Sequence, residues 1–236
     1  MMHPLRIRKI LLAGVFSLIL ISGEFLIHES SASSPKGRIQ DAAAILREMS
    51  GQDDAGTMGD LLSRAKGVAI FPSVVKAGVI FGGQYGEGLV LRRDAASKKW
   101  FGPSFVTVAG VSWGLQIGAQ SIALVLVITN DRGLEGFKGN NVKLGGDLAV
   151  AAGPVGRRGE LGTDYKMQAS IYSYSMTKGL FAGLSLEGAA ITVDENANQV
   201  YWGSPVSAKA ALDKSAASAE IKPLLAELDK LIREAR

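Results

Sequence analysis

The chain has 236 residues, of which 20% are charged, and its formal net charge is +4 at pH 7. It contains no cysteine, and both histidines, His3 and His28, lie near the amino terminus. The rest of the chain therefore excludes cysteine nucleophiles, histidine general bases, Ser-His-Asp triads and zinc sites of the Cys/His type, and its mild charge gives no indication of nucleic-acid binding.

Residues 1–32 have the organisation of a secretory signal peptide. Basic residues precede a short apolar run at residues 10–22, and small residues surround a candidate cleavage point after Ala32. The run is shorter than the roughly 20 residues that a spanning helix needs. We therefore expect export, to the periplasm or as a secreted protein, followed by a linker at residues 33–37. An uncleaved membrane anchor is the alternative.

Apolar residues recur at helical spacing from Arg38 to Ser50, with basic residues on or beside the polar face. This pattern predicts an amphipathic helix with two open roles. It packs on a sheet, or it lies in a membrane interface, where Ile39, Leu46 and Met49 would insert. A second, short helix is predicted at residues 58–66.

The centre of the chain has the pattern of two long neighbouring strands. Residues 111–120 alternate between apolar and polar, as a half-buried strand does, and Ile122–Ile128 is apolar throughout, as in a central strand. Gly110, Gly114 and Gly118 recur at every fourth residue, which favours a sheet strongly curved on itself. Shorter strands are expected at residues 68–71, 78–82, 88–93, 99–101, 142–144, 148–152, 166–175, 180–193 and 199–202.

Residues 131–138 look like one helical segment capped by Asn130 or Asp131. The composition shifts to Ala, Lys, Glu and Leu in the extension 204–236, where an apolar stripe predicts a helix that docks on the sheet or mediates self-association. The predicted fold is α+β. A strongly curved, mainly antiparallel, barrel-like sheet occupies residues 38–203, with helices from both ends packed on it.

Several separated blocks of the sequence resemble the SYLF domain family of lipid- and actin-binding modules. They are RAKGVAI (64–70), VKAG (75–78), WFGPS (100–104), GLQIG (114–118), GPVGRR (153–158), YSMTKGLFAG (174–183) and YWG (201–203). The resemblance covers about residues 39–203, and blocks in the right order are more specific than one short motif. It implies a module that binds membranes, in particular phosphoinositides, helped by its amphipathic segment Arg38–Met49. Some eukaryotic relatives bind and bundle actin, and the candidate export signal makes this chain similar to a bacterial, envelope-directed branch.

Basic residues near turns and strand ends are the candidate headgroup contacts. Arg92 and Arg93 lie beside an aromatic hairpin with Trp100, where guanidinium groups could hold an anionic headgroup or could simply block edge pairing. Arg157 and Arg158 follow a glycine turn whose N–H groups suit phosphate, although a plain turn fits equally well. The predicted lipid contacts are Arg38, Arg47, Lys76, Arg92, Arg93, Arg157, Arg158 and Lys178.

Two motifs suggest a cofactor or a metal ion but have ordinary structural explanations. The glycine run at residues 82–88 has the wrong spacing for a dinucleotide loop and predicts a hairpin. Asp194, Asn196 and Asn198 copy the first ligands of a calcium loop, but the glycine and the glutamate that the loop needs are missing, so these residues predict an ordinary turn. Because no carboxylates are paired for acid/base work, we expect no catalysis, cofactor or metal. The predicted function is binding of anionic phospholipid after export, and the alternative is a protein-binding module for actin or an envelope partner.

Overall fold

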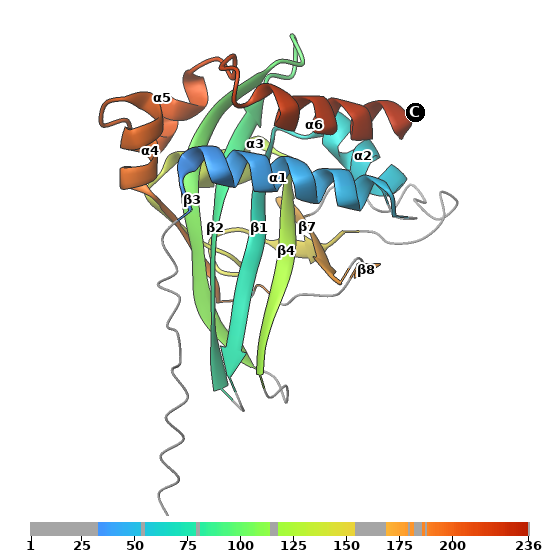
Figure 1. Ribbon diagram of the computed structural model, residues 1–236, viewed down its shortest axis with the longest axis vertical. Helices are drawn as coiled ribbons and strands as arrows, with labels where there is room; N and C mark the ends of the chain where they lie inside the picture. The colour runs from blue at the N-terminus through green and yellow to red at the C-terminus, as the bar shows by residue number, and fades with distance from the viewer. Residues whose placement is uncertain are drawn as a thin grey trace, which may run out of the picture. The chain divides into compact units, whose positions relative to one another are not determined.

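The structure is a computed structural model, shown in Figure 1. It describes residues 33–52, 55–78, 81–113, 118–153, 169–178, 180–181, 186 and 188–235. Residues 32–236 form one compact unit. No helix within the described ranges is both long and apolar enough to cross a membrane.

Nine strands of the described residues form one strongly curled sheet. They are β1 (Gly67–Gly78), β2 (Phe81–Arg93), β3 (Trp100–Trp113), β4 (Gly118–Ile128), β5 (Asn141–Lys143), β6 (Val150–Ala152), β7 (Ile171–Thr177), β8 (Leu180–Phe181) and β9 (Ala190–Val193). Their order is β5-β9-β3-β2-β1-β4-β7-β6, and β8 pairs with β7 outside this path. All pairs are antiparallel except β6–β7. The predicted α+β class and the mainly antiparallel sheet are thus confirmed.

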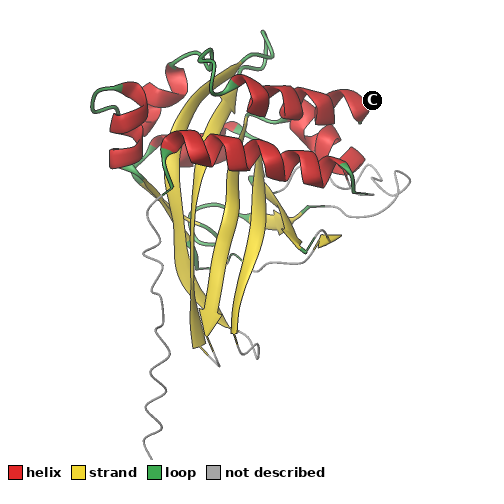
Figure 2. Cartoon of the chain, viewed as in Figure 1, coloured by secondary structure: helices red, strands yellow, loops and turns green. Residues whose placement is uncertain are grey.

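Helices from both ends of the chain and one from its middle cover this sheet, as Figure 2 shows. They are α1 (Pro35–Ser50), α2 (Ala55–Arg64), α3 (Asp131–Lys138), α4 (Glu195–Trp202), α5 (Ala208–Asp213) and α6 (Lys222–Glu234). The Ser34 hydroxyl caps α1 by accepting from the Gly37 N–H, and the Asn130 side chain caps α3 by accepting from the Gly133 N–H. The predicted helices at residues 38–50 and 131–138 are therefore confirmed, although α1 begins at Pro35, inside the expected linker.

The sheet separates two apolar cores, because successive side chains on a strand point to opposite faces. Val68 and Ile70 on β1 belong to the core beneath α1, α2 and α6. Ala69 and Phe71 belong to the second core, which α3 and α5 help to close. Residues 122–128 of β4 are all buried, as predicted for a central strand covered on both faces. The C-terminal α6 docks through Leu224, Leu228, Leu231 and Ile232 rather than leaving its apolar stripe free.

Three strand predictions need correction. β3 and β4 are not neighbours, because the β1–β2 pair lies between them, and residues 114–117, expected within a strand, lie outside the described residues. The expected strand at residues 78–82 spans the end of β1 and the start of β2. The expected strand at residues 199–202 is wrong. The Asp194 side chain accepts from the Ala197 N–H and starts a helix that includes those residues.

Candidate functional site

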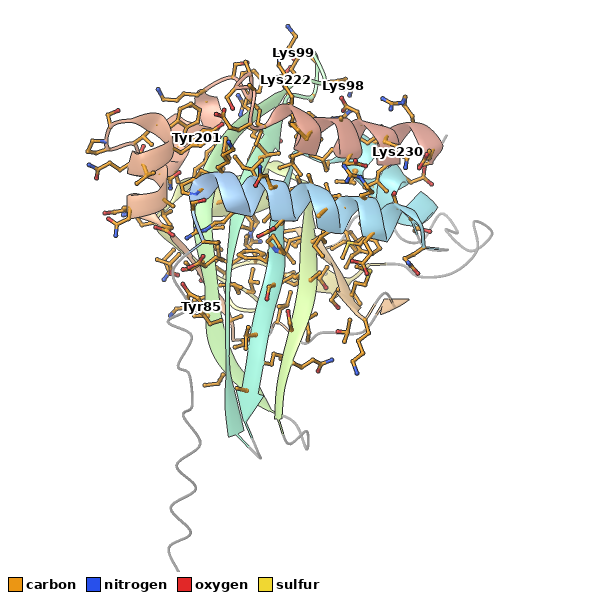
Figure 3. All side chains as sticks on the ribbon, viewed as in Figure 1. Tyr85, Lys98, Lys99, Tyr201, Lys222 and Lys230 are labelled. Carbon is orange, nitrogen blue, oxygen red and sulfur yellow. The ribbon has the colours of Figure 1, made fainter. Side chains whose placement is uncertain are left out.

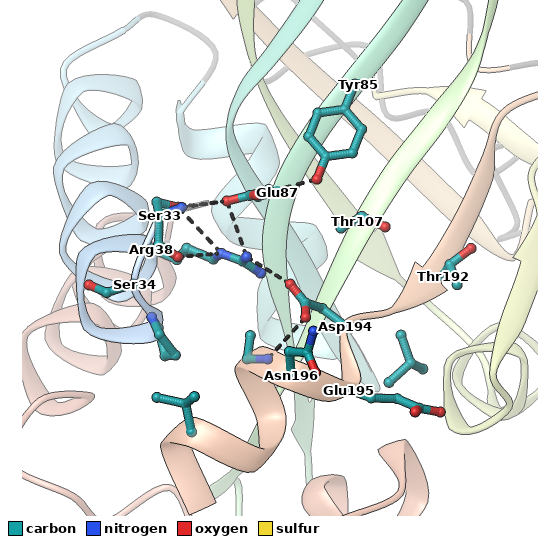
Figure 4. Close-up of a pocket in the computed structure, with 14 residues that line it drawn as sticks. Ser33, Ser34, Arg38, Tyr85, Glu87, Thr107, Thr192, Asp194, Glu195 and Asn196 are labelled. Carbon is teal, nitrogen blue, oxygen red and sulfur yellow. Dashed lines mark hydrogen bonds and ion pairs between the residues drawn. The ribbon is translucent and has the colours of Figure 1, made fainter. Parts of the chain in front are cut away.

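Arg38 lies at the centre of a buried cluster of charges, shown in Figure 4. Its Nη2 atom lies 3.1 Å from Oε2 of Glu87 on β2 and 2.7 Å from Oδ2 of Asp194, which precedes α4. The Arg38 side chain is 2% exposed, and the two carboxylate side chains are 16% and 17% exposed. The ion pairs therefore tie the start of α1 to β2 and to the start of α4.

Ser33 completes this cluster from the side of the N-terminal segment. Its backbone N–H and its hydroxyl each donate to Glu87 Oε2 at 2.9 Å. Arg38 Nε in turn donates to the Ser33 carbonyl oxygen at 3.1 Å. The Tyr85 hydroxyl donates to the other oxygen of Glu87 at 3.2 Å. We call Ser33, Arg38, Glu87 and Asp194 the Arg38 cluster; it contains one guanidinium and two carboxylates.

A cavity of about 840 Å³ lies beside the Arg38 cluster. Thr107, Thr192, Glu195 and Asn196 add polar groups to its wall (Figure 4). The three carboxylates of the wall outnumber its one guanidinium, so the cavity disfavours an anionic headgroup. Burial raises the pKa of the Tyr85 hydroxyl, and the negative charge of Glu87 raises it further.

The side chains predicted to enter a membrane are buried in this structure. Ile39, Leu46 and Met49 have no exposed surface and belong to the core between α1 and the sheet. The helix packs on the sheet, which was one of its two predicted roles. Contact with the sheet and with α6 removes its apolar side from water, as insertion into a bilayer would. Arg38, also predicted to contact lipid, is not accessible either.

The aromatic hairpin does not present the predicted headgroup site. Arg93 is buried, and its Nη1 donates to the backbone carbonyls of Leu62 at 3.2 Å and Ser63 at 2.6 Å. The Trp100 ring is buried, and its indole N–H donates to Asp229 at 3.3 Å. Both side chains therefore hold helices on the sheet. Their burial corrects the expectation that Arg93 and Trp100 form a headgroup site at a membrane interface. Sequence spacing cannot show this, because α2 and α6 cover the hairpin from distant parts of the chain.

Two further arginines are engaged but keep some contact with solvent. Arg92 stacks on the Phe101 ring, with its guanidinium carbon 4.1 Å from the ring centroid, and its Nε donates to the Leu212 carbonyl at 2.9 Å. Arg47 is 64% exposed and pairs with Glu227 at 2.7 Å. These contacts support the fold and leave only part of each side chain for a ligand.

Lys76 and Lys178 are brought to one region by the sheet. Lys76 on β1 pairs in register with Gln120 on β4, whose Nε2 lies 3.4 Å from Oγ1 of Thr177, the residue before Lys178. Burial lowers the pKa of Lys76. On its other side Lys76 pairs with the buried Gln84, whose amide atoms have no hydrogen-bond partner among the described residues. Arg157 and Arg158, the last predicted contacts, lie outside the described residues.

An exposed apolar surface was missed by sequence reasoning. Val75, Tyr85 and Val111 are 46%, 50% and 65% exposed. Val75 pairs with Tyr85, and Val111 pairs with Gly83, two residues from Tyr85, so these residues share one face of β1, β2 and β3. It is the face on which Glu87 meets α1, beyond the part that α1 covers (Figures 1 and 3). We call it the open face, comprising Val75, Ala77, Gly83, Tyr85 and Val111. The alternation of apolar residues was visible in the sequence, but the edge of the helical cover was not.

Comparison with known proteins identifies the family. The family model described as "Ysc84: Las17-binding protein actin regulator" matches residues 109–231. The chain belongs to the Ysc84 (SYLF) family. This confirms the resemblance to SYLF domains, and it places the chain in a family described as an actin regulator and not as an enzyme.

The proteins similar to this chain include several from eukaryotes. "SH3 domain-containing YSC84-like protein 1" of Bos taurus is 36% identical over 176 residues, which is 72% of this chain and 51% of that protein. The Xenopus laevis protein of the same name is 34% identical over 177 residues, covering 72% and 52%. "LAS seventeen-binding protein 3" of Saccharomyces cerevisiae is 35% identical over 153 residues, covering 64% and 33%. The Ysc84-family chain thus spans about half the length of the first two proteins and a third of the last.

Proposed function

We propose that this Ysc84-family chain is a non-catalytic module that binds a protein partner on the open face. The observation that carries the proposal is the clustering of exposed apolar groups. Of the four large apolar side chains exposed among the described residues, three lie together on adjacent strands. Scattered exposed apolar residues are ordinary, whereas a contiguous patch marks an interaction surface.

The character of the open face suits a protein partner. Its five residues carry no charge, and a Cβ placed on Gly83 would have no atom within 4 Å, so a partner can approach the backbone of β2 closely. A family member is named for binding LAS seventeen, and the family description names an actin regulator. We therefore propose a partner from the machinery that regulates actin. Where the chain does not meet actin, we propose a protein whose surface is similar to that of such a partner.

Two valine substitutions test this proposal as a matched pair. Val111→Asp places a carboxylate on the open face, and Val200→Asp places one on α4, where Val200 is 71% exposed and lines the cavity. Binding to actin filaments and to a purified Las17-type protein would be measured by co-sedimentation and by titration. We expect Val111→Asp to weaken binding at least tenfold and Val200→Asp to leave it unchanged. If Val200→Asp weakened binding and Val111→Asp did not, the partner site would lie at the cavity. If both variants bound like the unsubstituted chain, the open face would not be the partner site.

Anionic phospholipid is the second candidate ligand. It is favoured by Lys76 and Lys178, which lie in one region and have no anionic partner among the described residues. Vesicles of neutral phosphatidylcholine, with and without phosphatidylserine, would be sedimented at low and high salt. Binding that needs the anionic lipid, falls with salt and is lost in the double variant Lys76→Gln, Lys178→Gln would support this function. Lys98→Gln, Lys99→Gln is the matched control, since Figure 3 shows both lysines at the opposite end of the long strands.

A further inference from the structure

The Arg38 cluster is short of positive charge. Its two carboxylates form ion pairs, within the described residues, with the single guanidinium of Arg38. Both carboxylate side chains are more than four-fifths buried, and buried charges are stable only when they are paired. Hydrogen bonds from Ser33 to Glu87 and from the Ala197 N–H to Asp194 help, but they bring no charge.

The nitrogen of Ser33 occupies the position where a second cation would be needed. It lies 2.9 Å from Glu87 Oε2, the distance of a good ion-pair hydrogen bond. The same nitrogen forms the peptide bond to Ala32, after which the small residues of the N-terminal segment predict cleavage. The sequence and the geometry therefore point independently to the Ala32–Ser33 bond.

We propose that the mature chain begins at Ser33 and that its α-amino group is the second cation of the Arg38 cluster. A processing peptidase would hydrolyse the Ala32–Ser33 bond with one water molecule. The C–N bond breaks, the water oxygen stays on Ala32 as part of a carboxylate, and the Ser33 nitrogen becomes an ammonium. Such a group has an ordinary pKa of about 7.7 to 8.0 and is mostly charged at neutral pH.

The register of cleavage decides whether the cluster is completed. An ammonium at Ser33 replaces a neutral donor at 2.9 Å by a charged one and balances two carboxylates with two cations. Cleavage one residue earlier would place the charge about one residue spacing, ~3.8 Å, farther along the chain. Cleavage one residue later would remove the Ser33 hydroxyl and carbonyl, which bind Glu87 and Arg38. Processing after Ala32 thus locks the start of α1 onto β2 and α4.

The first test follows the full chain through processing. It would be expressed with its own N-terminal segment in a bacterium that exports such proteins, and the N-terminus of the purified product would be determined by sequencing and intact mass. We expect Ser33 as the first residue. A retained N-terminal segment, or a first residue other than Ser33, would overturn the proposal.

The second test asks whether the new amine contacts Glu87. The processed protein and its Glu87→Gln variant would be acetylated at about pH 6.5, where lysine amines are protonated and the α-amine reacts preferentially. Acetylation should lower the melting temperature of the unsubstituted protein by about 2 to 8 °C. It should have almost no effect on Glu87→Gln, which has lost the charged partner but carries the same lysines. Equal shifts in the two proteins would show that the amine is not part of the cluster.

Discussion

Replacing Arg38 with methionine would deprive Glu87 and Asp194 of the cation that they share. Methionine keeps much of the side-chain volume and has a similar helix propensity, so α1 itself should still form. The change removes ion pairs of 3.1 and 2.7 Å and the hydrogen bond to the Ser33 carbonyl. Because the guanidinium is 2% exposed, water has little access to the space that it leaves.

The expected cost follows from the burial of the pair. Breaking a buried ion pair by removing one partner costs about 3 to 5 kcal/mol. The two carboxylates keep some contact with water and keep their hydrogen bonds, so we expect the lower end of this range, about 3 kcal/mol. For a chain of this length that corresponds to a fall in melting temperature of about 6 to 12 °C. Thermal unfolding followed by circular dichroism at pH 7 would measure it.

Arg47→Met is the matched control, because it removes an arginine from the same helix. The Arg47–Glu227 pair is largely exposed on the arginine side, and exposed pairs contribute about 0 to 1 kcal/mol. Adding Glu87→Gln to Arg38→Met should recover part of the loss, since one uncompensated charge is then removed. Equal losses in the Arg38 and Arg47 variants would refute the reasoning that burial sets the cost.

Three further substitutions address other contacts of the fold. Asn198→Ala should cost about 1 to 3 kcal/mol in urea unfolding, because the Asn198 amide accepts from the Phe105 N–H at 2.9 Å and this donor would lose that partner, whereas the Phe105 carbonyl keeps the hydrogen bond from the Asp194 N–H. Gly59→Ala should cost about 1 to 3 kcal/mol by the same measurement, because a Cβ there would overlap the Leu231 carbonyl oxygen where α2 meets α6. Burial raises the pKa of Tyr201 above its ordinary value of 10.0, so the unfolded chain loses that proton first and stability should fall above about pH 10. Tyr201→Phe should make this fall shallower.

Each of these has a control or a contrary outcome. Gly83→Ala adds the same methyl group where no atom lies within 4 Å, so it should change stability by less than about 0.5 kcal/mol. A similar loss at Gly59 and Gly83 would mean that backbone freedom, and not the helix contact, sets the cost. If Asn198→Ala were neutral, the Phe105 N–H would have to find another acceptor. A Tyr201→Phe profile that runs parallel to that of the unsubstituted chain would show that burial of this phenol is not what alkaline pH disturbs.

Much of the fold follows from periodicity, which reports local burial. The stripe of α1, the cap at Asn130 and the fully apolar Ile122–Ile128 each reflect a face that must be covered, and each prediction is confirmed. Periodicity does not tell which strands are neighbours. The β1–β2 pair separates β3 from β4, although β3 and β4 follow each other in the chain. Sequential adjacency is only a tendency, and here the backbone of β1 pairs with both β2 and β4.

The candidate site was harder to predict, because its parts come from distant segments. Arg38 lies at the edge of the apolar stripe of α1, where the sequence allows either solvent or burial. Its partners Glu87 and Asp194 lie on β2 and before α4, and only the folded sheet brings them within 3.1 Å. The residues after Asp194 were predicted as a turn and a strand. The capping role of that aspartate was the available signal for a helix.

The open face and the Arg38 cluster meet on β2, and this constrains how the two proposals relate. Tyr85 and Glu87 are two residues apart on the same face of the strand, and the Tyr85 hydroxyl donates to Glu87 at 3.2 Å. A partner that covers Tyr85 would bury this hydrogen bond further. It would therefore bind more tightly to the chain in which the Ser33 ammonium is also paired with Glu87. Val111, in contrast, lies on β3 and pairs with Gly83. Acetylating the Ser33 amine should consequently weaken partner binding only when the partner reaches Tyr85, whereas Val111→Asp should weaken it in either case, so the two measurements together locate the edge of the interface.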